Sequence, residues 1–203
     1  MMTGTDILMT GVGGQGVILA SDILADCAVA AGYDVKKTDS LGMAQRGGSV
    51  TSNVRIAQRV FSPLIPQGGA HFLVAYERLE ALRFLGQLRP GGVVIFDSQS
   101  VVPLSVFNEG YHYPSTEEVS ERLSSVTRHV YMLPAADMAA GLGNPRVSSV
   151  LCLGALSRFL DIPHDIWRQG IERHLPPRLL DINLAAFGAG ARAVQGQLKE
   201  GGE

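Results

Sequence analysis

The chain has 203 residues, 46% of them hydrophobic, 18% charged and 6% aromatic, a composition that supports a sizeable core and excludes an intrinsically disordered chain. Its formal net charge is -2, from 17 basic and 19 acidic residues, and without a basic arm or stripe the usual nucleic-acid-binding classes are excluded. The length favours one domain over residues 1–203 and is too short for a complete (β/α)₈ barrel.

The first forty residues predict a strand, a glycine turn, a helix and a second strand. The apolar run at 7–10 ends in Gly11-Val12-Gly13-Gly14-Gln15-Gly16, and apolar residues then recur at helical spacing over 17–31. Gly32 is expected to end this helix, and residues 33–38 form a second strand that completes a unit of βαβ size. Residues 39–49 show no periodicity and are predicted to form a loop.

The middle of the chain continues the alternation of strands and helices. Residues 50–56 alternate between apolar and polar, which predicts a strand that lies at an edge or runs antiparallel. The apolar runs at 72–75 and 93–96 are typical of buried parallel strands. Between them we expect an amphipathic helix over 77–88, followed by a stop at Pro90-Gly91-Gly92.

The remainder becomes helical after one more strand. Ser115 and Glu118 fit a capping box at the start of a short helix, and residues 129–133 are predicted as a strand. Further helices are expected at 135–140, 146–160, 164–174 and 180–198. The sequence therefore predicts an α/β fold of Rossmann-like type, a mostly parallel sheet flanked by helices, with an all-helical C-terminal cap over 134–203.

The glycine turn matches the dinucleotide fingerprint at Gly11, Gly13 and Gly16. Glycines allow a tight turn, and the new helix offers free N–H groups to a phosphate. The fingerprint also includes an acidic residue after the second strand. Asp39 fits that role, although it follows the last glycine at slightly more than the usual spacing. Two interpretations stay open, a nucleotide or pyrophosphate site and a tight helix–sheet junction that binds nothing.

A second glycine segment, Gly42 to Ser49, contains Arg46 as its only charged residue. An arginine offers a planar fork of donors to phosphate or carboxylate, and Gly47-Gly48 allows close approach of a ligand. The alternative is a surface turn with a solvated arginine. Loops at the carboxyl ends of strands converge in a doubly wound sheet, which would bring together the loops at 11–16, 39–49, 76–77 and 97–98.

The candidate binding residues are therefore those of the two glycine segments with the acidic residue between them. They are Gly11, Gly13, Gly14, Gln15, Gly16, Asp39, Gln45, Arg46, Gly47 and Gly48. We assign no catalytic residue, because no histidine or cysteine stands in a recognisable nucleophile motif.

Targeting signals and metal motifs are also missing from the sequence. The longest uncharged stretch, Val60 to Tyr76, contains two prolines and a Gly-Gly pair, which argues against a membrane span. The N-terminus lacks the features of a signal peptide, which predicts a cytoplasmic protein. Cys27 and Cys152 lie far apart without a C-x-x-C motif, so we expect no iron–sulfur cluster or zinc site on this chain.

Taken together, the two glycine segments 11–17 and 43–50 resemble the signature pair of the gamma-type subunits of 2-oxoacid:ferredoxin oxidoreductases. Within that family the beta subunits of indolepyruvate:ferredoxin oxidoreductases are the most similar. The resemblance continues over nearly the whole chain, through Glu80-Ala81-Leu82, Pro90 to Val94, Tyr113-Pro114-Ser115, Gly143 to Arg146, Leu153 to Leu156 and Asn183 to Phe187. It departs at Ser148-Ser149, where the family is expected to have an asparagine.

The resemblance implies one subunit of an enzyme that oxidatively decarboxylates an aryl or other 2-oxoacid, giving an acyl-coenzyme A and reduced ferredoxin. Thiamine diphosphate, Mg²⁺ and [4Fe-4S] clusters are then expected on a large partner subunit, and ferredoxin is reached through the complex. This chain would bind none of these cofactors alone, and its glycine-rich crevice would complete the partner's active site and hold coenzyme A phosphates.

Two other classes of protein remain. A free-standing NAD(P)- or FAD-binding oxidoreductase would use the first glycine motif and Asp39, but it gives residues 43–49 no role and lacks a candidate base. A nucleotide-binding regulatory module would bind its ligand without an obligate partner.

Overall fold

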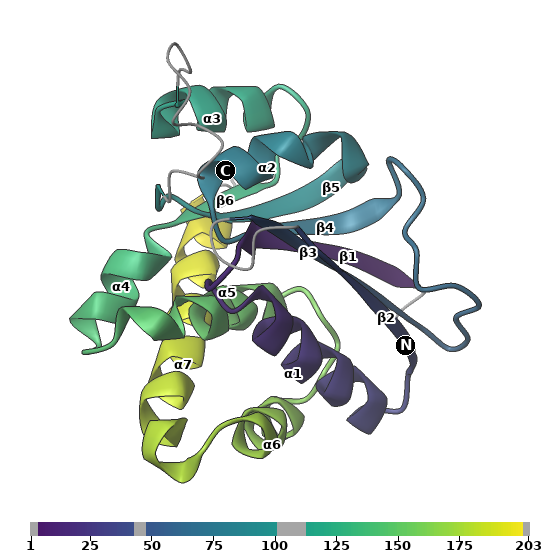
Figure 1. Cartoon of the computed structure of the whole chain (residues 1–203), viewed down its shortest axis with the longest axis vertical. Coiled ribbons are helices and arrows are strands. Elements are labelled where there is room, and N and C mark those ends of the chain that lie inside the picture. Colours follow the sequence, from purple (N-terminus) through teal and green to yellow (C-terminus); the bar gives the residue numbers. More distant parts are fainter. Residues whose placement is uncertain (1–3, 43–47, 101–112, 201–203) are drawn as a thin grey trace.

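The computed structural model describes residues 4–42, 48–100 and 113–200, which form one sheet between two layers of helices (Figure 1). The strands are β1 Thr5–Val12, β2 Asp34–Leu41, β3 Ser49–Ala57, β4 Ala70–Ala75, β5 Leu88–Asp97 and β6 Val130–Leu133. The helices are α1 Val17–Ala30, α2 Arg78–Arg83, α3 Thr116–Ser124, α4 Ala135–Gly141, α5 Ser148–Ser157, α6 His164–His174 and α7 Leu180–Glu200.

The six strands lie in the order β2-β3-β1-β4-β5-β6. β3 runs antiparallel to both of its neighbours, while β1, β4, β5 and β6 pair in parallel. The predicted Rossmann-like, mostly parallel sheet is thus confirmed. The strand predicted at 50–56 is antiparallel as expected but lies inside the sheet, because the outer position belongs to β2.

Successive residues of each strand supply two different cores, as the alternation of side chains in a strand requires. On one face Ile7 and Met9 of β1 belong to a large cluster with α1, α5, α6 and α7. On the other face Leu8 joins a smaller cluster formed with α2 and α3. Figure 1 shows these two helix layers on opposite sides of the sheet.

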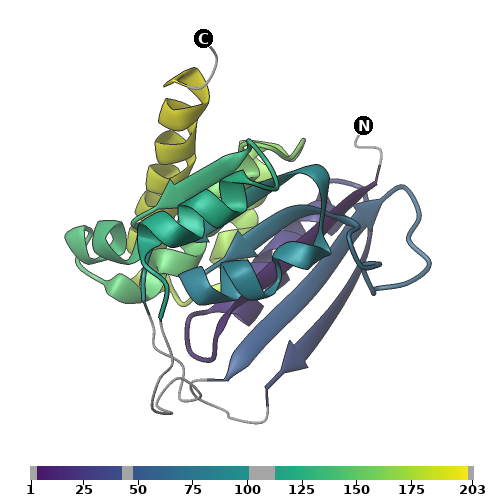
Figure 2. The same cartoon turned by 90° about the horizontal axis from the view of Figure 1, so that it is seen from above.

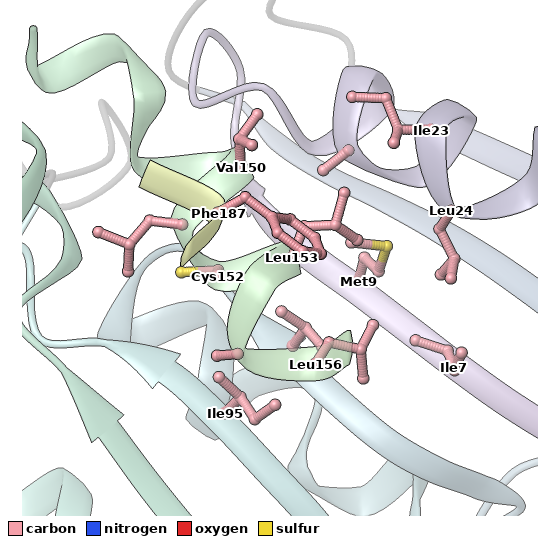
Figure 3. Packing of buried hydrophobic residues seen from close by; sticks show 14 of the residues in the cluster. Ile7, Met9, Ile23, Leu24, Ile95, Val150, Cys152, Leu153, Leu156 and Phe187 are labelled. Atoms are coloured by element: carbon pink, nitrogen blue, oxygen red, sulfur yellow. The ribbon is translucent and has the colours of Figure 1, made fainter. Parts of the chain in front are cut away.

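The larger core is built around α5, eight of whose ten residues are buried. Figure 3 shows Leu153 and Leu156 of α5 packed between Met9 of β1 and Ile95 of β5. α7 crosses α5 at glycines, since a Cβ at Gly190 would lie 1.8 Å from the Leu151 carbonyl oxygen. The two helix backbones are therefore in direct contact, and this contact brings α7 against the core.

Three predicted boundaries were wrong. Residues 39–41 belong to β2, because its antiparallel pairing with β3 continues to Leu41, opposite Val50. Pro90-Gly91-Gly92 does not precede the next strand but lies within β5, at a register shift in its pairing with β4. The helix predicted over 77–88 ends at Arg83 and continues only as a 3₁₀ turn at Leu85–Gln87.

Beyond β6 the described chain is helical, as predicted, and its helices share the sheet face that α1 covers. α7 continues past the edge of the sheet and projects from the body of the molecule (Figure 2). Among the residues that the structure describes, no helix combines the length and apolar character needed to cross a bilayer.

Candidate functional site

The loops at the carboxyl ends of β1 and β4 meet beside the start of β3. The Tyr76 N–H donates to the Thr10 carbonyl at 2.8 Å, and the Gly13 N–H donates to the Gly48 carbonyl at 2.8 Å. At the end of β5, the Ser98 N–H bonds to the Leu133 carbonyl at 2.9 Å. These bonds join the end of β1, the end of β4 and Gly48 at this edge, as predicted, while residues 43–47 of the second glycine segment fall outside the described residues.

The β1–α1 turn requires glycine at two positions. Gly14 has φ +105° and Gly16, which caps α1 in the left-handed conformation, has φ +82°, values that residues with a Cβ adopt only with strain. A Cβ at Gly16 would also lie 2.6 Å from the Ser149 hydroxyl oxygen. Ser149, one of the two serines at which the family resemblance departs, therefore packs against the turn.

The side chain of Gln15 closes this turn from within. Its Oε1 accepts the Val12 N–H at 2.7 Å, and its Nε2 donates to the Tyr76 carbonyl at 2.7 Å. A Cβ at Gly11 would lie only 2.9 Å from the same Oε1. Gln15 thus links the turn to the end of β4, and its amide is occupied by the protein's own backbone.

A hollow of about 340 Å³ opens next to this turn. Its described lining combines glycine backbone with apolar side chains from α1, β2 and β3, and includes no charged residue: Val12, Gly13, Gly14, Gly16, Val17, Ile18, Leu19, Leu41 and Val50. The first N–H groups of α1 have no partner within the helix, and they carry partial positive charge. The hollow can therefore offer backbone donors at one end and apolar contact along its walls.

The second glycine segment is only partly described. Gly48 lies at the site through its bond to Gly13, whereas Gln45, Arg46 and Gly47 fall outside the described residues. Their predicted role therefore stays a prediction.

Asp39 lies inside β2, and its carboxylate accepts the Lys37 ammonium at 2.7 Å. Lys37 also contacts Asp22 of α1 at 2.6 Å. In a dinucleotide site the acidic residue follows the strand next to β1. Here β3 is inserted between β1 and β2, which moves Asp39 one strand further from the glycine turn, a distance of ~5 Å in a sheet.

Two buried glutamates, which the sequence did not single out as site residues, lie beside the same turn. Glu77 and Glu80 are 0% and 1% exposed. Glu77 caps α2 by accepting the Glu80 N–H at 3.0 Å. Burial raises the pKa of Glu77 from 4.5 to about 7, against the opposing effect of backbone N–H groups. The available signal was a carboxylate directly after a buried strand, in the 76–77 loop that the sequence places at this edge without assigning Glu77 a role.

Asp97 at the end of β5 is a third buried carboxylate at this edge. Its Oδ1 accepts the N–H groups of Gln99 at 3.0 Å and Ala135 at 3.1 Å. Burial raises its pKa from 3.8 to about 6. Its bonds join the end of β5 to the start of α4, so its role is to fix the local backbone.

Thiols and metals add no chemistry to the described part of the chain. Burial raises the pKa of Cys27 to about 12, and it also raises the pKa of Cys152, so neither thiol forms a reactive thiolate. In residues 4–42, 48–100 and 113–200, no three His, Cys, Asp or Glu side chains are grouped to hold a metal ion.

Comparison with known proteins gives a consistent result. Residues 6–193 match the family model described as pyruvate ferredoxin/flavodoxin oxidoreductase. A protein of Archaeoglobus fulgidus named indolepyruvate oxidoreductase subunit IorB is 35% identical over 195 residues, which are 95% of this chain and 96% of that protein.

Solved structures share the fold. The gamma subunit of a keto/oxoacid ferredoxin oxidoreductase from Geobacter sulfurreducens superposes with a TM-score of 0.72 at 22% identity, covering 95% of this chain and 99% of that one. A 2-oxoglutarate:ferredoxin oxidoreductase from Magnetococcus marinus, solved with 2-oxoglutarate, coenzyme A and succinyl-CoA bound, gives 0.73 at 20% identity. This superposition covers 97% of this chain and 32% of that larger chain.

Proposed function

The chain belongs to the pyruvate ferredoxin/flavodoxin oxidoreductase family, and from that premise we propose that it is the small subunit of a 2-oxoacid:ferredoxin oxidoreductase. The observation that carries the proposal is the match over 95% of the chain to a protein named as an indolepyruvate oxidoreductase subunit. Because both chains are matched almost end to end, the similarity concerns the whole subunit.

The proposed reaction is the oxidative decarboxylation of indolepyruvate or another aryl pyruvate. The 2-oxoacid loses its carboxylate as CO₂, its acyl carbon forms a thioester with coenzyme A, and the electrons released pass to ferredoxin. The name of the 35% identical relative supports the aryl class, whereas relatives named as 2-oxoglutarate synthase subunits are 26% to 30% identical.

The residues of this chain do not fit thiamine diphosphate or an iron–sulfur cluster. The sequence has no Gly-Asp-Gly segment of the kind that holds a thiamine-linked Mg²⁺, and its two cysteines are both buried. We therefore assign thiamine diphosphate, Mg²⁺ and the [4Fe-4S] clusters to a large partner subunit. The electron chemistry and the contact with ferredoxin belong to the complex.

The part of this chain in the reaction is to complete the partner's site at the glycine turn. Gly14 and Gly16 shape the backbone at the start of α1, where free N–H groups favour an anion such as a coenzyme A phosphate. The apolar hollow suits the neutral part of such a ligand or an apolar side chain of the partner. Arg46, with Gln45 and Gly47, is proposed to add the charge that the described lining lacks.

The alternative of a free-standing NAD(P) or FAD enzyme is not favoured. Asp39 is paired with Lys37 and separated from the turn by β3, so the contact that would recognise a ribose is displaced. We further propose that residues 1–203 act as one domain and that the complex is cytoplasmic.

The proposal is tested by reconstitution with the large subunit encoded in the same organism. We expect the mixture to reduce a dye in a reaction that depends on both an aryl pyruvate and coenzyme A, while each subunit alone is inactive. Indolepyruvate, phenylpyruvate, pyruvate and 2-oxoglutarate are compared at equal concentration to define the substrate class. Full activity of the large subunit without this chain would contradict the proposal, as would a stoichiometric cluster spectrum from this chain alone.

A further inference from the structure

Helix α2 presents two buried carboxylates to the glycine turn from the sheet face opposite α1. Glu77 and Glu80 stand three residues apart, at the N-cap and in the first turn of this six-residue helix. Both are almost fully buried. A carboxylate out of water carries a large desolvation cost unless several donors compensate it. The donors that bond to each carboxylate therefore indicate which segments it holds in place.

Glu80 joins the two strands that lead into the two glycine segments. Its Oε2 accepts the hydroxyl of Thr10 at 3.3 Å and also the hydroxyl of Ser49. Thr10 directly precedes Gly11, and Ser49 directly follows Gly48. One oxygen atom therefore bonds to both strands near the Gly13–Gly48 backbone hydrogen bond, at Ser49 beside Gly48 and at Thr10 three residues before Gly13.

The other oxygen of Glu80 is also used. Its Oε1 lies 3.3 Å from Nη1 of Arg83, one turn further along α2. Arg83 therefore supplies the counter-charge that makes burial of the carboxylate tolerable.

Glu77 holds a third segment to the same helix. Its Oε1 accepts the hydroxyl of Tyr113, and the Arg78 guanidinium lies 4.7 Å from the centre of the Tyr113 ring. Arg78 in turn donates to the Thr116 hydroxyl at 3.0 Å. The first turn of α2 thus joins the start of α3 to the glycine region.

Simple packing does not account for Glu80. Glu77 has a structural task as the N-cap of α2, but the Glu80 carboxylate caps no helix. A contact between α2 and β1 alone could be made by apolar side chains without any desolvation cost. The carboxylate adds directional hydrogen bonds, because two hydroxyls must point at one oxygen atom. These bonds fix how β1 and β3 enter the site.

We propose that Glu80 is a positioning residue that sets the geometry of the glycine turn through the hydroxyls of Thr10 and Ser49, without touching the ligand. The inference deepens the proposed function and rests on it for the reaction that the turn serves. It assigns a functional role to the polar contact between α2 and the turn.

The experiment uses Glu80→Met, which removes both acceptor oxygens at similar length, Glu80→Gln, which keeps one, and Ser49→Ala, which removes one donor with little effect on the core. Thr127→Val is the matched control. It deletes a buried hydroxyl that donates to the Gly92 carbonyl at 2.7 Å, at the opposite edge of the sheet. Hydrogen exchange is measured in the full chain, and steady-state kinetics in the reconstituted complex.

We expect Glu80→Met and Ser49→Ala to accelerate amide exchange at residues 11–17, with Glu80→Gln restoring most of the protection and Thr127→Val leaving it unchanged. In the complex, the KM for coenzyme A or the dissociation constant of the subunits should rise about tenfold, as for loss of one hydrogen bond to a charged group. The kcat at saturation should stay within roughly twofold, since a positioning residue acts on binding. The double variant Glu80→Met with Ser49→Ala should be no worse than Glu80→Met alone.

Unchanged exchange at 11–17 in Glu80→Met would overturn the inference, as would a Thr127→Val effect of equal size. Should Glu80→Met fail to fold, Ser49→Ala and Glu80→Gln decide by the same measurements. If the wild-type chain proves dispensable for the enzyme, the proposed function fails, and the exchange data still determine whether Glu80 orders the turn.

Discussion

Glycine serves different purposes in two regions of this molecule. Between α5 and α7, Gly154 and Gly190 let two helix backbones touch, with carbonyl oxygens 2.0 Å and 1.8 Å from where a Cβ would stand. In the turn after β1, Gly14 has open space around it and is needed for its φ of +105°. The helix pair therefore depends on close packing, and the turn depends on backbone conformation.

The largest effect is expected at the helix pair. Gly190→Ala places a methyl group against the Leu151 carbonyl, so the helices must separate, and the free energy of unfolding should fall by about 3 kcal/mol or more. Urea denaturation measures this. Gly196→Ala in the same helix is the control, because nothing lies within 4 Å of its Cβ, and helix propensity predicts a gain of about 0.5 to 1 kcal/mol. Equal losses in the two variants would contradict the close-packing interpretation.

The carboxylates beneath the turn should make stability depend on pH. Glu77 has a pKa of about 7 in the folded chain and 4.5 as its ordinary value, so the folded state holds a proton that the unfolded state releases. The contribution of Glu77 to the free energy of unfolding is complete below pH 4.5 and is lost as the pH rises through 7. Between pH 5 and pH 8 the free energy of unfolding of the wild type should therefore fall by on the order of 2 kcal/mol relative to that of Glu77→Gln.

Denaturation of both proteins at a series of pH values checks this. The contribution of Asp97, whose pKa is also raised, is common to the two proteins and cancels in the difference. A difference that stays constant from pH 5 to pH 8 would show that Glu77 titrates normally.

Two matched glycines separate the effect of backbone conformation on stability from the effect of the turn on binding. Gly14 and Gly32 both have positive φ and open space around the missing Cβ, so Gly14→Ala and Gly32→Ala should each cost about 1 to 2 kcal/mol of stability. Only Gly14→Ala should weaken coenzyme A or subunit binding in the reconstituted enzyme. If both variants retain wild-type binding, the turn is only a connection between β1 and α1.

The smallest effect on stability is expected at Arg46. Arg46→Ala should change the free energy of unfolding by no more than roughly 0.5 kcal/mol, the range for surface substitutions. Loss of a contact to phosphate or to a partner carboxylate would instead weaken binding by roughly ten- to a hundredfold. Arg46→Lys should recover part of this, because it keeps the charge without the planar fork. Titrations of coenzyme A and of the partner subunit identify the contact. Wild-type affinities for both would show that Arg46 is a solvated residue of a surface turn.

Most elements of the fold could be predicted from local pattern. Apolar runs located the parallel strands, and Ser115 with Glu118 formed the expected capping box. The order of the strands could not be predicted, because the alternation in β3 indicates two unlike faces and says nothing about which strands lie beside it. The boundary at Leu41 failed for a related reason, since residues 39–41 are strand only through their pairing with β3.

The candidate site was predictable where it depends on glycine and less so where it depends on burial. The contact of the first glycine segment with Gly48 followed from sequence and sheet topology. Glu77 and Glu80 did not, because an acidic residue at a helix start is normally solvated, and the hydroxyls of Ser49 and Tyr113 that bond to them are distant in sequence. Hydrogen bonds from distant hydroxyls leave no local signal in the sequence.

The position of β2 at the rim of the sheet also bears on how the isolated chain behaves. Its outer side offers backbone groups with no ladder partner among the described residues, which is the usual template for aggregation. Two lysines and two aspartates occupy its eight residues, and Lys37 is bonded to both Asp22 and Asp39. An added strand would have to desolvate these charges, so β2 discourages extension of the sheet by a further strand.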